Sequence, residues 1–262
     1  MNLLICCLAM VILNSACLAG NEVFSSGIDK KTGREFDVYK TKNSEVKLTF
    51  VGHGSLMIEH KDKVYHVDPW TKIADYSKFP KADGIFITHS HFDHYDKDAV
   101  SILFKPNTIV FGPDDVIKDY PDKSKPANEG NSGSFGELKY TAVPAYNIEH
   151  LRDGKNPFHP RGFGVGYVFE IDGLKIYVAG DTENIPEMAE LSEQKINIAL
   201  LPMNLPYTMS RNMFVDACNK VKPEILYPYH TVGTESKQFE GKELEALKME
   251  CGGAKILIRK ME

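Results

Sequence analysis

The chain has few cysteines, and this limits how it can be stabilised. Of the five in its 262 residues, only Cys218 and Cys251 lie beyond residue 20. Two widely separated cysteines do not make a disulfide framework, and neither has the neighbouring Cys or His of a zinc finger. They could pair in an oxidising compartment, but we favour two buried thiols. The fold therefore depends on a hydrophobic core, which a chain of this length can build.

The sequence also lacks an excess of positive charge, long runs of like charge and repeats of fixed period. Its formal net charge is −5 and its pI is about 6.0, which argues against a general binder of nucleic acids or anionic membranes. The 42% of hydrophobic and 26% of charged residues are ordinary for a soluble globular protein. We predict a small-molecule partner and no nucleic-acid partner.

No charged side chain occurs in the first segment, Met1–Gly20. An apolar stretch over 3–13 is followed by small residues up to Ala19 and Gly20. This is the pattern of a signal peptide, although the segment has no Lys or Arg at its start. The stretch is short for a membrane span, so we predict export, periplasmic or secreted, without stable membrane insertion after cleavage. A less favoured alternative is a lipid anchor on Cys17, because 13–17 loosely resembles a bacterial lipobox.

The remaining sequence predicts one α/β domain. Residues 21–45 are polar with weak periodicity and are interpreted as an N-terminal arm with one short strand over 35–39, whereas no linker divides 46–262. We predict strands over 46–50, 55–59, 63–68, 84–88, 108–111, 138–143, 164–171, 174–179, 196–201, 225–229 and 255–258. Helices are predicted over 96–103, 114–119, 185–191, 211–220 and 237–249. The segment 120–136 is predicted to be a loop. Strands precede helices in each half, which favours two sheets with helices outside them.

The most informative segment is 88–94, Thr-His-Ser-His-Phe-Asp-His, which follows the apolar run 84–87. Imidazole nitrogens and carboxylate oxygens are ligands of zinc, manganese and iron. A polar loop that is rich in histidine by chance is the simpler interpretation. It is disfavoured because the whole chain has only nine histidines and three fall in this window.

Other polar residues follow predicted strands and are expected to converge with this loop at one sheet edge. They are Asp68, Asn147, His150, Asp181 and His230. In an extended loop His89 and His91 point the same way and can reach one ion, while Asp93 and His94 can face a second. Asp181 follows a glycine that lets the backbone come close, so it suits a bridging carboxylate. The spacing therefore predicts two divalent ions.

The segment 88–94 resembles the H-x-H-x-D-H signature of the metallo-β-lactamase superfamily. Gly180-Asp181-Thr182 resembles the bridging-aspartate motif of that superfamily, and Tyr229-His230 resembles its last histidine. Further details resemble the subgroup of ascorbate-6-phosphate lactonases and the N-acylphosphatidylethanolamine phospholipase D type. These details are Gly52-His53-Gly54-Ser55, Asp68-Pro69 and Tyr207-Thr208-Met209.

The resemblance implies an αββα sandwich of two mixed sheets flanked by helices, with the site at one edge. It implies a first ion on His89 and His91, a second on Asp93 and His94, a bridge from Asp181, and His230 completing the second site. The third histidine of the first site is either His150 or His159. Motif position favours His159, although Asn147 occupies the position that best matches the ligand of phospholipase-type relatives.

Three residues are candidates for contacts around the ligands or with substrate: His53, Tyr146 and Asn147. His53 is equally well explained as a turn residue, and Tyr146 as a packing residue. Arg152, Lys155 and Arg161 form a basic group that could attract an anionic substrate, although a solvated loop is the favoured interpretation.

The predicted function is hydrolysis of an ester, lactone or phosphodiester by a metal-activated water, with Asp93 holding or accepting a proton. Zinc is the favoured ion, with manganese or iron as alternatives. The competing interpretation is a non-catalytic metal-binding or sensing protein that keeps the same fold. The sequence leaves the substrate, the number of ions bound and the oligomeric state open.

Overall fold

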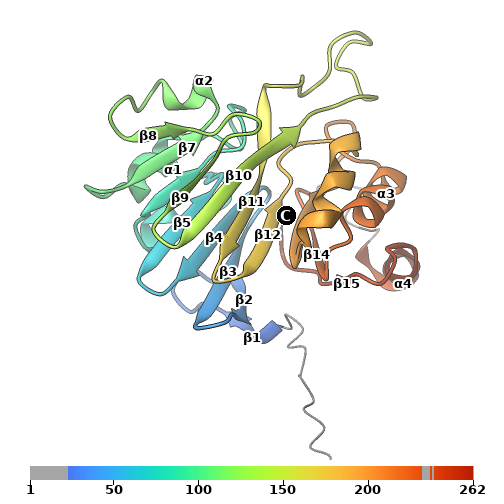
Figure 1. The fold of residues 1–262 in the computed structure, drawn as a ribbon, viewed down its shortest axis with the longest axis horizontal. Coiled ribbons are helices and arrows are strands. Elements are labelled where there is room, and N and C mark those ends of the chain that lie inside the picture. Colours follow the sequence, from blue (N-terminus) through green and yellow to red (C-terminus); the bar gives the residue numbers. More distant parts are fainter. Residues whose placement is uncertain (1–22, 232–236, 238, 262) are drawn as a thin grey trace, which may run out of the picture.

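The computed structural model describes residues 23–231, 237 and 239–261. The predicted signal peptide, including Cys17, lies outside the described residues. Two sheets face each other, and helices lie on the outer side of each (Figure 1). This arrangement confirms the expected αββα sandwich.

The first sheet takes its eight strands in chain order. They are β1 (Val23–Ile28), β2 (Glu35–Lys40), β3 (Glu45–Gly52), β4 (Ser55–His60), β5 (Lys63–Val67), β6 (Gly84–Phe86), β7 (Ile109–Gly112) and β8 (Ser124–Pro126). Strands β1 to β5 pair antiparallel, and β5 to β8 pair parallel.

The second sheet repeats this change from antiparallel to parallel pairing. In sheet order its strands are β9 (Ser132–Phe135), β10 (Leu138–Ala145), β11 (Gly164–Ile171), β12 (Leu174–Val178), β13 (Ile198–Pro202), β14 (Ile225–Tyr229) and β15 (Lys255–Ile256). Strands β9 to β12 pair antiparallel, and β12 to β15 pair parallel.

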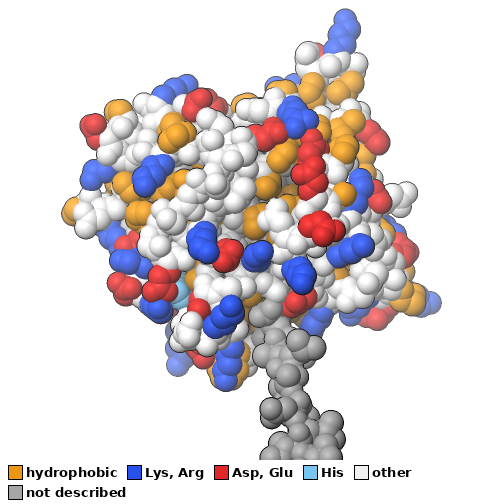
Figure 2. Space-filling model, viewed as in Figure 1, with side chains coloured by type: hydrophobic (Ala, Val, Ile, Leu, Met, Phe, Trp, Pro, Cys, Tyr) orange, Lys and Arg blue, Asp and Glu red, His pale blue; other side chains and the backbone are white. Residues whose placement is uncertain are grey.

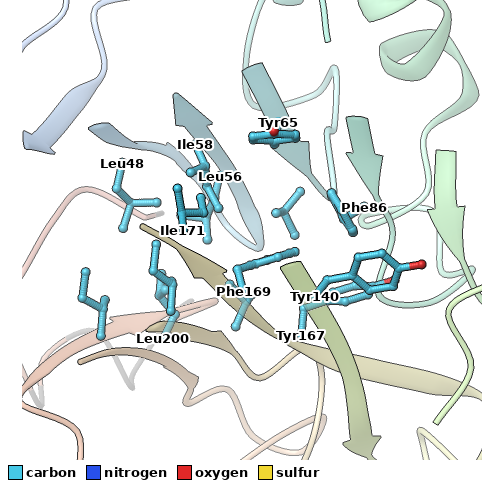
Figure 3. Packing of buried hydrophobic residues seen from close by; sticks show 14 of the residues in the cluster. Leu48, Leu56, Ile58, Tyr65, Phe86, Tyr140, Tyr167, Phe169, Ile171 and Leu200 are labelled. Atoms are coloured by element: carbon cyan, nitrogen blue, oxygen red, sulfur yellow. The ribbon is translucent and has the colours of Figure 1, made fainter. Parts of the chain in front are cut away.

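Three buried clusters account for the layers. The largest lies between the sheets and includes Leu48, Phe86, Phe169 and Leu200 (Figure 3). A second packs sheet two against the 3₁₀ helix η2 (Pro186–Gln194) and the helices α3 (Arg211–Val221) and α4 (Gly241–Glu250). A third packs sheet one against η1 (Tyr76–Lys78), α1 (Lys97–Leu103) and α2 (Asp114–Ile117). Burying apolar area on both faces of each sheet is the main source of stability.

Two expectations need correction. The segment 21–45 is not only a lead-in, because β2 pairs with β3 and β1 pairs with β2, so both strands extend the first sheet. The segment 120–136 was expected to be a loop but contains β8 and β9. Their sequences, Ser-Lys-Pro and Ser-Gly-Ser-Phe, have no alternating apolar pattern and both are largely exposed, so the periodicity of a half-buried strand is missing.

Other local features concern a helix cap, the cysteines and the surface. Asp96 caps α1 by accepting hydrogen bonds from the backbone N–H of Asp98 and Ala99. Cys218 and Cys251 are buried free thiols, as favoured. No helix in the described part of the chain is long and apolar enough to cross a membrane. On the face shown in Figure 2, acidic and basic side chains are interspersed, without a large patch of one sign.

Candidate metal centre

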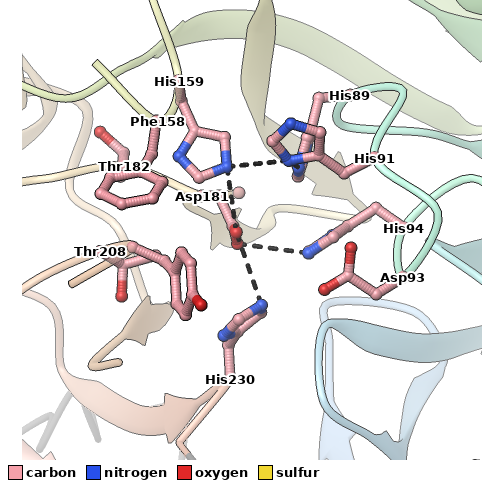
Figure 4. Close-up of polar contacts among 12 residues, drawn as sticks. His89, His91, Asp93, His94, Phe158, His159, Asp181, Thr182, Thr208 and His230 are labelled. Carbon is pink, nitrogen blue, oxygen red and sulfur yellow. Dashed lines mark hydrogen bonds and ion pairs between the residues drawn. The ribbon is translucent and has the colours of Figure 1, made fainter. Parts of the chain in front are cut away.

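The site lies where strands of both sheets end. Asp68 follows β5, the segment 88–94 follows β6, Gly180-Asp181 comes two residues after β12, and His230 follows β14 directly. These strands belong to the parallel parts of the sheets, whose carboxyl ends meet at a common edge. The topology therefore brings residues that are far apart in the chain, such as His89 and His230, which are 141 positions apart, into one cluster (Figure 4).

The turns that carry this cluster are conformationally unusual. His53, Asp68 and His230 have φ values of 50°, 43° and 51°, which non-glycine residues rarely adopt. Gly54 is required by a close approach, because a Cβ there would lie 2.7 Å from Cε1 of His94. Backbone strain held in place by surrounding structure is typical of functional sites.

Three groups of possible metal ligands share members and overlap in space. They are His89, His91 and His159; His89, His94 and Asp181; and His53, Asp93, His94 and His230, with the ligand atoms of each group within 4.8 Å of one another. The first and third groups match the two predicted sites, with His53 as an additional member. All seven predicted ligands are therefore brought together.

Asp181 occupies the centre of the cluster. Its Oδ1 lies 3.4 Å from Nε2 of His94, and its Oδ2 lies 3.4 Å from Nε2 of His159 and 3.5 Å from Nε2 of His230 (Figure 4). One carboxylate thus faces imidazoles of both predicted sites, which is the position of a bridging ligand.

Several of these buried atoms have no hydrogen-bond partner. They are Nε2 of His94, Nε2 of His230 and Oδ1 of Asp181. Buried polar atoms without a partner are rare because each one costs desolvation energy. Because these three point toward one another and are all metal-ligating atoms, the donor set fits divalent cations.

Four of the histidines are held by their other ring nitrogen. Nδ1 of His94 lies 2.8 Å from Oδ2 of Asp68, and Nδ1 of His159 lies 2.7 Å from Oδ1 of Asn147. Nδ1 of His89 lies 3.0 Å from Oγ1 of Thr88. Nδ1 of His230 lies 3.3 Å from Nδ2 of Asn204. Such contacts orient the ring and leave Nε2 to face the site.

The charges of the cluster suit cation binding. Burial lowers the pKa of His159 and of His230 to about 4, and burial together with His94 lowers the pKa of His89 well below its usual range. Burial lowers the pKa of His94 too, but the carboxylates of Asp181 and Asp68 outweigh it and hold that pKa well above its usual range. Neutral imidazoles have a free lone pair, so most of the set is ready to bind a cation.

Geometry favours His159 over His150 as the third histidine of the first group. His159 joins His89 and His91, with its Nε2 3.2 Å from Nδ1 of His91. Nδ1 of His150 instead lies 2.5 Å from Oε1 of Glu183, and His150 belongs to none of the three groups. His159 is thus the better candidate.

Glu183 and Asn204 are site residues that the sequence reasoning did not identify. The Glu183 carboxylate is buried and accepts the backbone N–H of Ile148, Glu149 and His150. It also accepts a hydrogen bond of 3.1 Å from Nδ2 of Asn147. The only available signal was that Glu183 follows the Gly180-Asp181-Thr182 motif.

The three outer candidates differ. His53 lies in the cluster, with Nε2 3.1 Å from Oδ2 of Asp93 and its ring 3.7 Å from that of His230. Asn147 also lies there, bound to His159. The Tyr146 side chain does not, because its hydroxyl donates to Glu187 at 3.0 Å and its ring packs under Arg161. Only the backbone of Tyr146 contacts the site, through Thr182 and Glu183.

Comparison with known proteins agrees with this geometry. The model of the beta-lactamase superfamily domain matches residues 47–230. The chain belongs to the metallo-β-lactamase superfamily. Among its relatives is the UPF0173 metal-dependent hydrolase of Archaeoglobus fulgidus, which is 30% identical over 71% of this chain and 83% of that protein. The UPF0173 metal-dependent hydrolase of Nanoarchaeum equitans is 32% identical over 71% of this chain and 83% of that protein.

Solved structures of two hydrolases are similar to this chain as well. A putative metal-dependent hydrolase from Parabacteroides distasonis is 40% identical, with a TM-score of 0.76 over 87% of this chain and 99% of that one. Igni18, a metallo hydrolase from Ignicoccus hospitalis, is 26% identical, with a TM-score of 0.67 over 82% and 95%. The relatives do not single out the lactonase and phospholipase subgroup, so the assignment stays at the level of the superfamily.

The contact between Asn147 and His159 gives a testable prediction for this metallo-β-lactamase-like site. In Asn147→Ala, His159 loses the acceptor for its Nδ1 and for its backbone N–H. We expect zinc affinity at one site to fall about 10- to 100-fold, the usual cost of losing such a contact. Zinc competition against a chromophoric chelator measures this. Asn128→Ala, which removes side-chain hydrogen bonds to Asp114 and belongs to none of the ligand groups, is the control. Equal affinities of the two variants would contradict the prediction.

Proposed function

We propose that this protein hydrolyses a small-molecule ester, lactone or phosphodiester at a centre that holds two divalent ions. The broader class, a metal-dependent hydrolase, follows from the superfamily and from relatives that carry this name. The observation that carries the finer proposal is the position of Asp181, whose two oxygens face histidines of both ligand groups.

The residues proposed as ligands divide into two sites. His89, His91 and His159 would hold one ion, Asp93, His94 and His230 the other, and Asp181 both. Divalent ions in such a site lower the pKa of water toward about 7 and polarise the oxygen of the bond to be cleaved. Because five of the seven ligands are imidazoles, the set suits zinc or iron better than manganese, and zinc is proposed.

Asp93 is the residue proposed to hold the attacking water. Burial raises the pKa of its carboxyl, but the hydrogen bond from His53 and the nearby His94 outweigh burial and bring this pKa to about 2. Asp93 is therefore ionised at neutral pH and accepts a hydrogen bond from the water. A base with so low a pKa is poorly matched to removing the proton completely, so its proposed role is to orient the water.

Elemental analysis combined with a substrate screen tests the proposal. The full chain is expected to contain two zinc ions and to hydrolyse members of a panel of esters, lactones and phosphodiesters, with loss of activity on chelation and recovery on adding zinc. His91→Ala is expected to lose this activity. If the metal-loaded protein and His91→Ala are equally inactive across the panel, a non-catalytic metal-binding protein is the better description. Export through the segment 1–20 remains part of the proposal.

A further inference from the structure

A cavity beside the metal centre is used by none of the roles described above. Its volume is about 580 Å³, and its lining includes His91, Arg152, Phe158 and Phe163 together with Pro157 and Pro160. His91 is shared with the proposed first metal site. A molecule bound in this cavity would therefore touch the centre, as expected for a substrate pocket that adjoins its reactive groups.

The walls of the cavity are aromatic and are fixed by packing. The ring centroid of Phe163 lies 4.9 Å from that of His91. Phe158 packs edge-on against Tyr207 with centroids 5.0 Å apart, and the side chain of Asn147 donates to the backbone carbonyl of Tyr207 at 2.9 Å. The Phe158 wall is thus connected through Tyr207 to Asn147, the residue that holds His159. The cavity therefore keeps a fixed position relative to the proposed metal ligands.

Arg152 is the charged group of this cavity. Its guanidinium lies 5.7 Å from the centroid of the Phe158 ring and donates to the carbonyl of Phe158 at 3.5 Å. Among residues 23–231, 237 and 239–261 it forms no ion pair with a carboxylate. By contrast, Arg161 pairs with Glu129 and Glu187, and Lys155 does not line the cavity. Arg152 and Lys155 are both exposed, so the position of Arg152 at the cavity is what distinguishes it. The basic group noted in the sequence is thus divided, and only Arg152 offers its charge to the cavity.

The loops that carry site residues expose several large apolar side chains. Of the large hydrophobic side chains that are exposed in the described residues, five belong to loops that carry site residues: Phe92, Ile148, Leu151, Leu205 and Tyr207. Tyr207 among them packs against the Phe158 wall of the cavity, and exposed apolar side chains beside a site commonly contact a ligand. A small polar substrate would leave this surface in water.

We propose that the Arg152 cavity binds the substrate next to the bond that is cleaved, and that this part of the substrate is apolar and carries an anionic group paired with Arg152. A guanidinium binds carboxylate and phosphate in the same two-pronged way, so either group satisfies the chemistry. The inference rests on the proposed function for the position of the reacting bond, but the binding itself does not depend on turnover.

Calorimetry on the zinc-loaded full chain tests the proposal with 4-phenylbutyrate, 3-phenylpropyl phosphate and the neutral 4-phenylbutyramide. The wild type is expected to bind at least one of the anions about 10-fold more tightly than the amide, as expected for one charge-assisted contact. The tighter anion identifies the group. Arg152→Ala is expected to abolish the preference, Arg152→Lys to restore part of it, and Lys155→Ala, which removes the same charge from the same loop, to keep it.

Two results would overturn this proposal. One is that the wild type shows no preference for either anion. The other is that Arg152→Ala keeps the wild-type preference for the anion. That result would show that the metal centre binds the anion without Arg152. If the preference depends on Arg152 but no ester, lactone or phosphodiester is hydrolysed, the cavity assignment stands and the proposed reaction fails.

Discussion

We expect Asp181→Asn to lower kcat/KM on the order of 10³-fold or more, at the upper end of what is lost when a single group that stabilises charge is removed from an active site. Among the residues that the structure describes, Asp181 is the one carboxylate that faces histidines of both ligand groups. It is buried, and although burial raises its pKa, His230 and His94 hold that pKa well below its usual range. The substitution removes this charge while keeping the shape of the side chain.

The measurements are kcat/KM on the best substrate of the panel and zinc per chain, together with thermal unfolding to show that the variant is folded. Zinc is expected to fall to about one ion per chain or fewer, because both sites lose a ligand. Asp119→Asn makes the same chemical change in a carboxylate that pairs with Lys97, and it should retain wild-type activity and zinc. A folded Asp181→Asn with two zinc ions and normal turnover would show that Asp181 does not bridge.

Much of this site could be predicted from the sequence because most ligands lie directly after strands. His89, His91, Asp93 and His94 occupy one short loop after β6, and Asp181 and His230 follow β12 and β14. For such residues, the hydrophobic pattern predicts that the strand exists and where it ends, and the end of the strand gives the position of the ligand. Order and spacing along the chain were then enough to assign them to one edge.

The contacts around His159 could not be predicted in the same way. His159 lies in the long connection between β10 and β11, which has no regular element of its own. Its position depends on Asn147, and the position of Asn147 depends on the buried carboxylate of Glu183. Hydrogen bonds between residues 12 and 36 positions apart leave no periodic pattern. The sequence therefore gave two candidate histidines, and only the path of this loop separates them.

The same loop connects the metal centre to the proposed binding cavity. Asn147 holds His159 through one side-chain oxygen and Tyr207 through its nitrogen, while Tyr207 supports the Phe158 wall. Changes in the 147–163 connection should therefore alter metal binding and substrate choice together, whereas Asp93, held from the opposite side by His53, is positioned independently of this loop.

This separation makes Asp93→Asn the sharpest test of the proposed chemistry. We expect kcat to fall about 10²- to 10³-fold, the range for losing one group that stabilises the reacting atoms through a hydrogen bond, while KM changes little. Asparagine keeps an oxygen of similar position but has no negative charge. It binds metal more weakly and accepts a weaker hydrogen bond from the attacking water.

Assays at saturating zinc separate these two effects. If Asp93 serves only as a ligand, excess zinc refills the site and restores most of kcat. If Asp93 also orients the water, the loss of kcat persists although zinc analysis shows a full complement. Asp62→Asn, at an exposed turn beside Lys63, controls for the loss of one negative charge and should match the wild type. Full recovery of Asp93→Asn in excess zinc would remove the water-orienting role and leave Asp93 as a ligand alone. Excess zinc can refill the site, but it cannot restore the hydrogen bond that the attacking water donates to the Asp93 carboxylate.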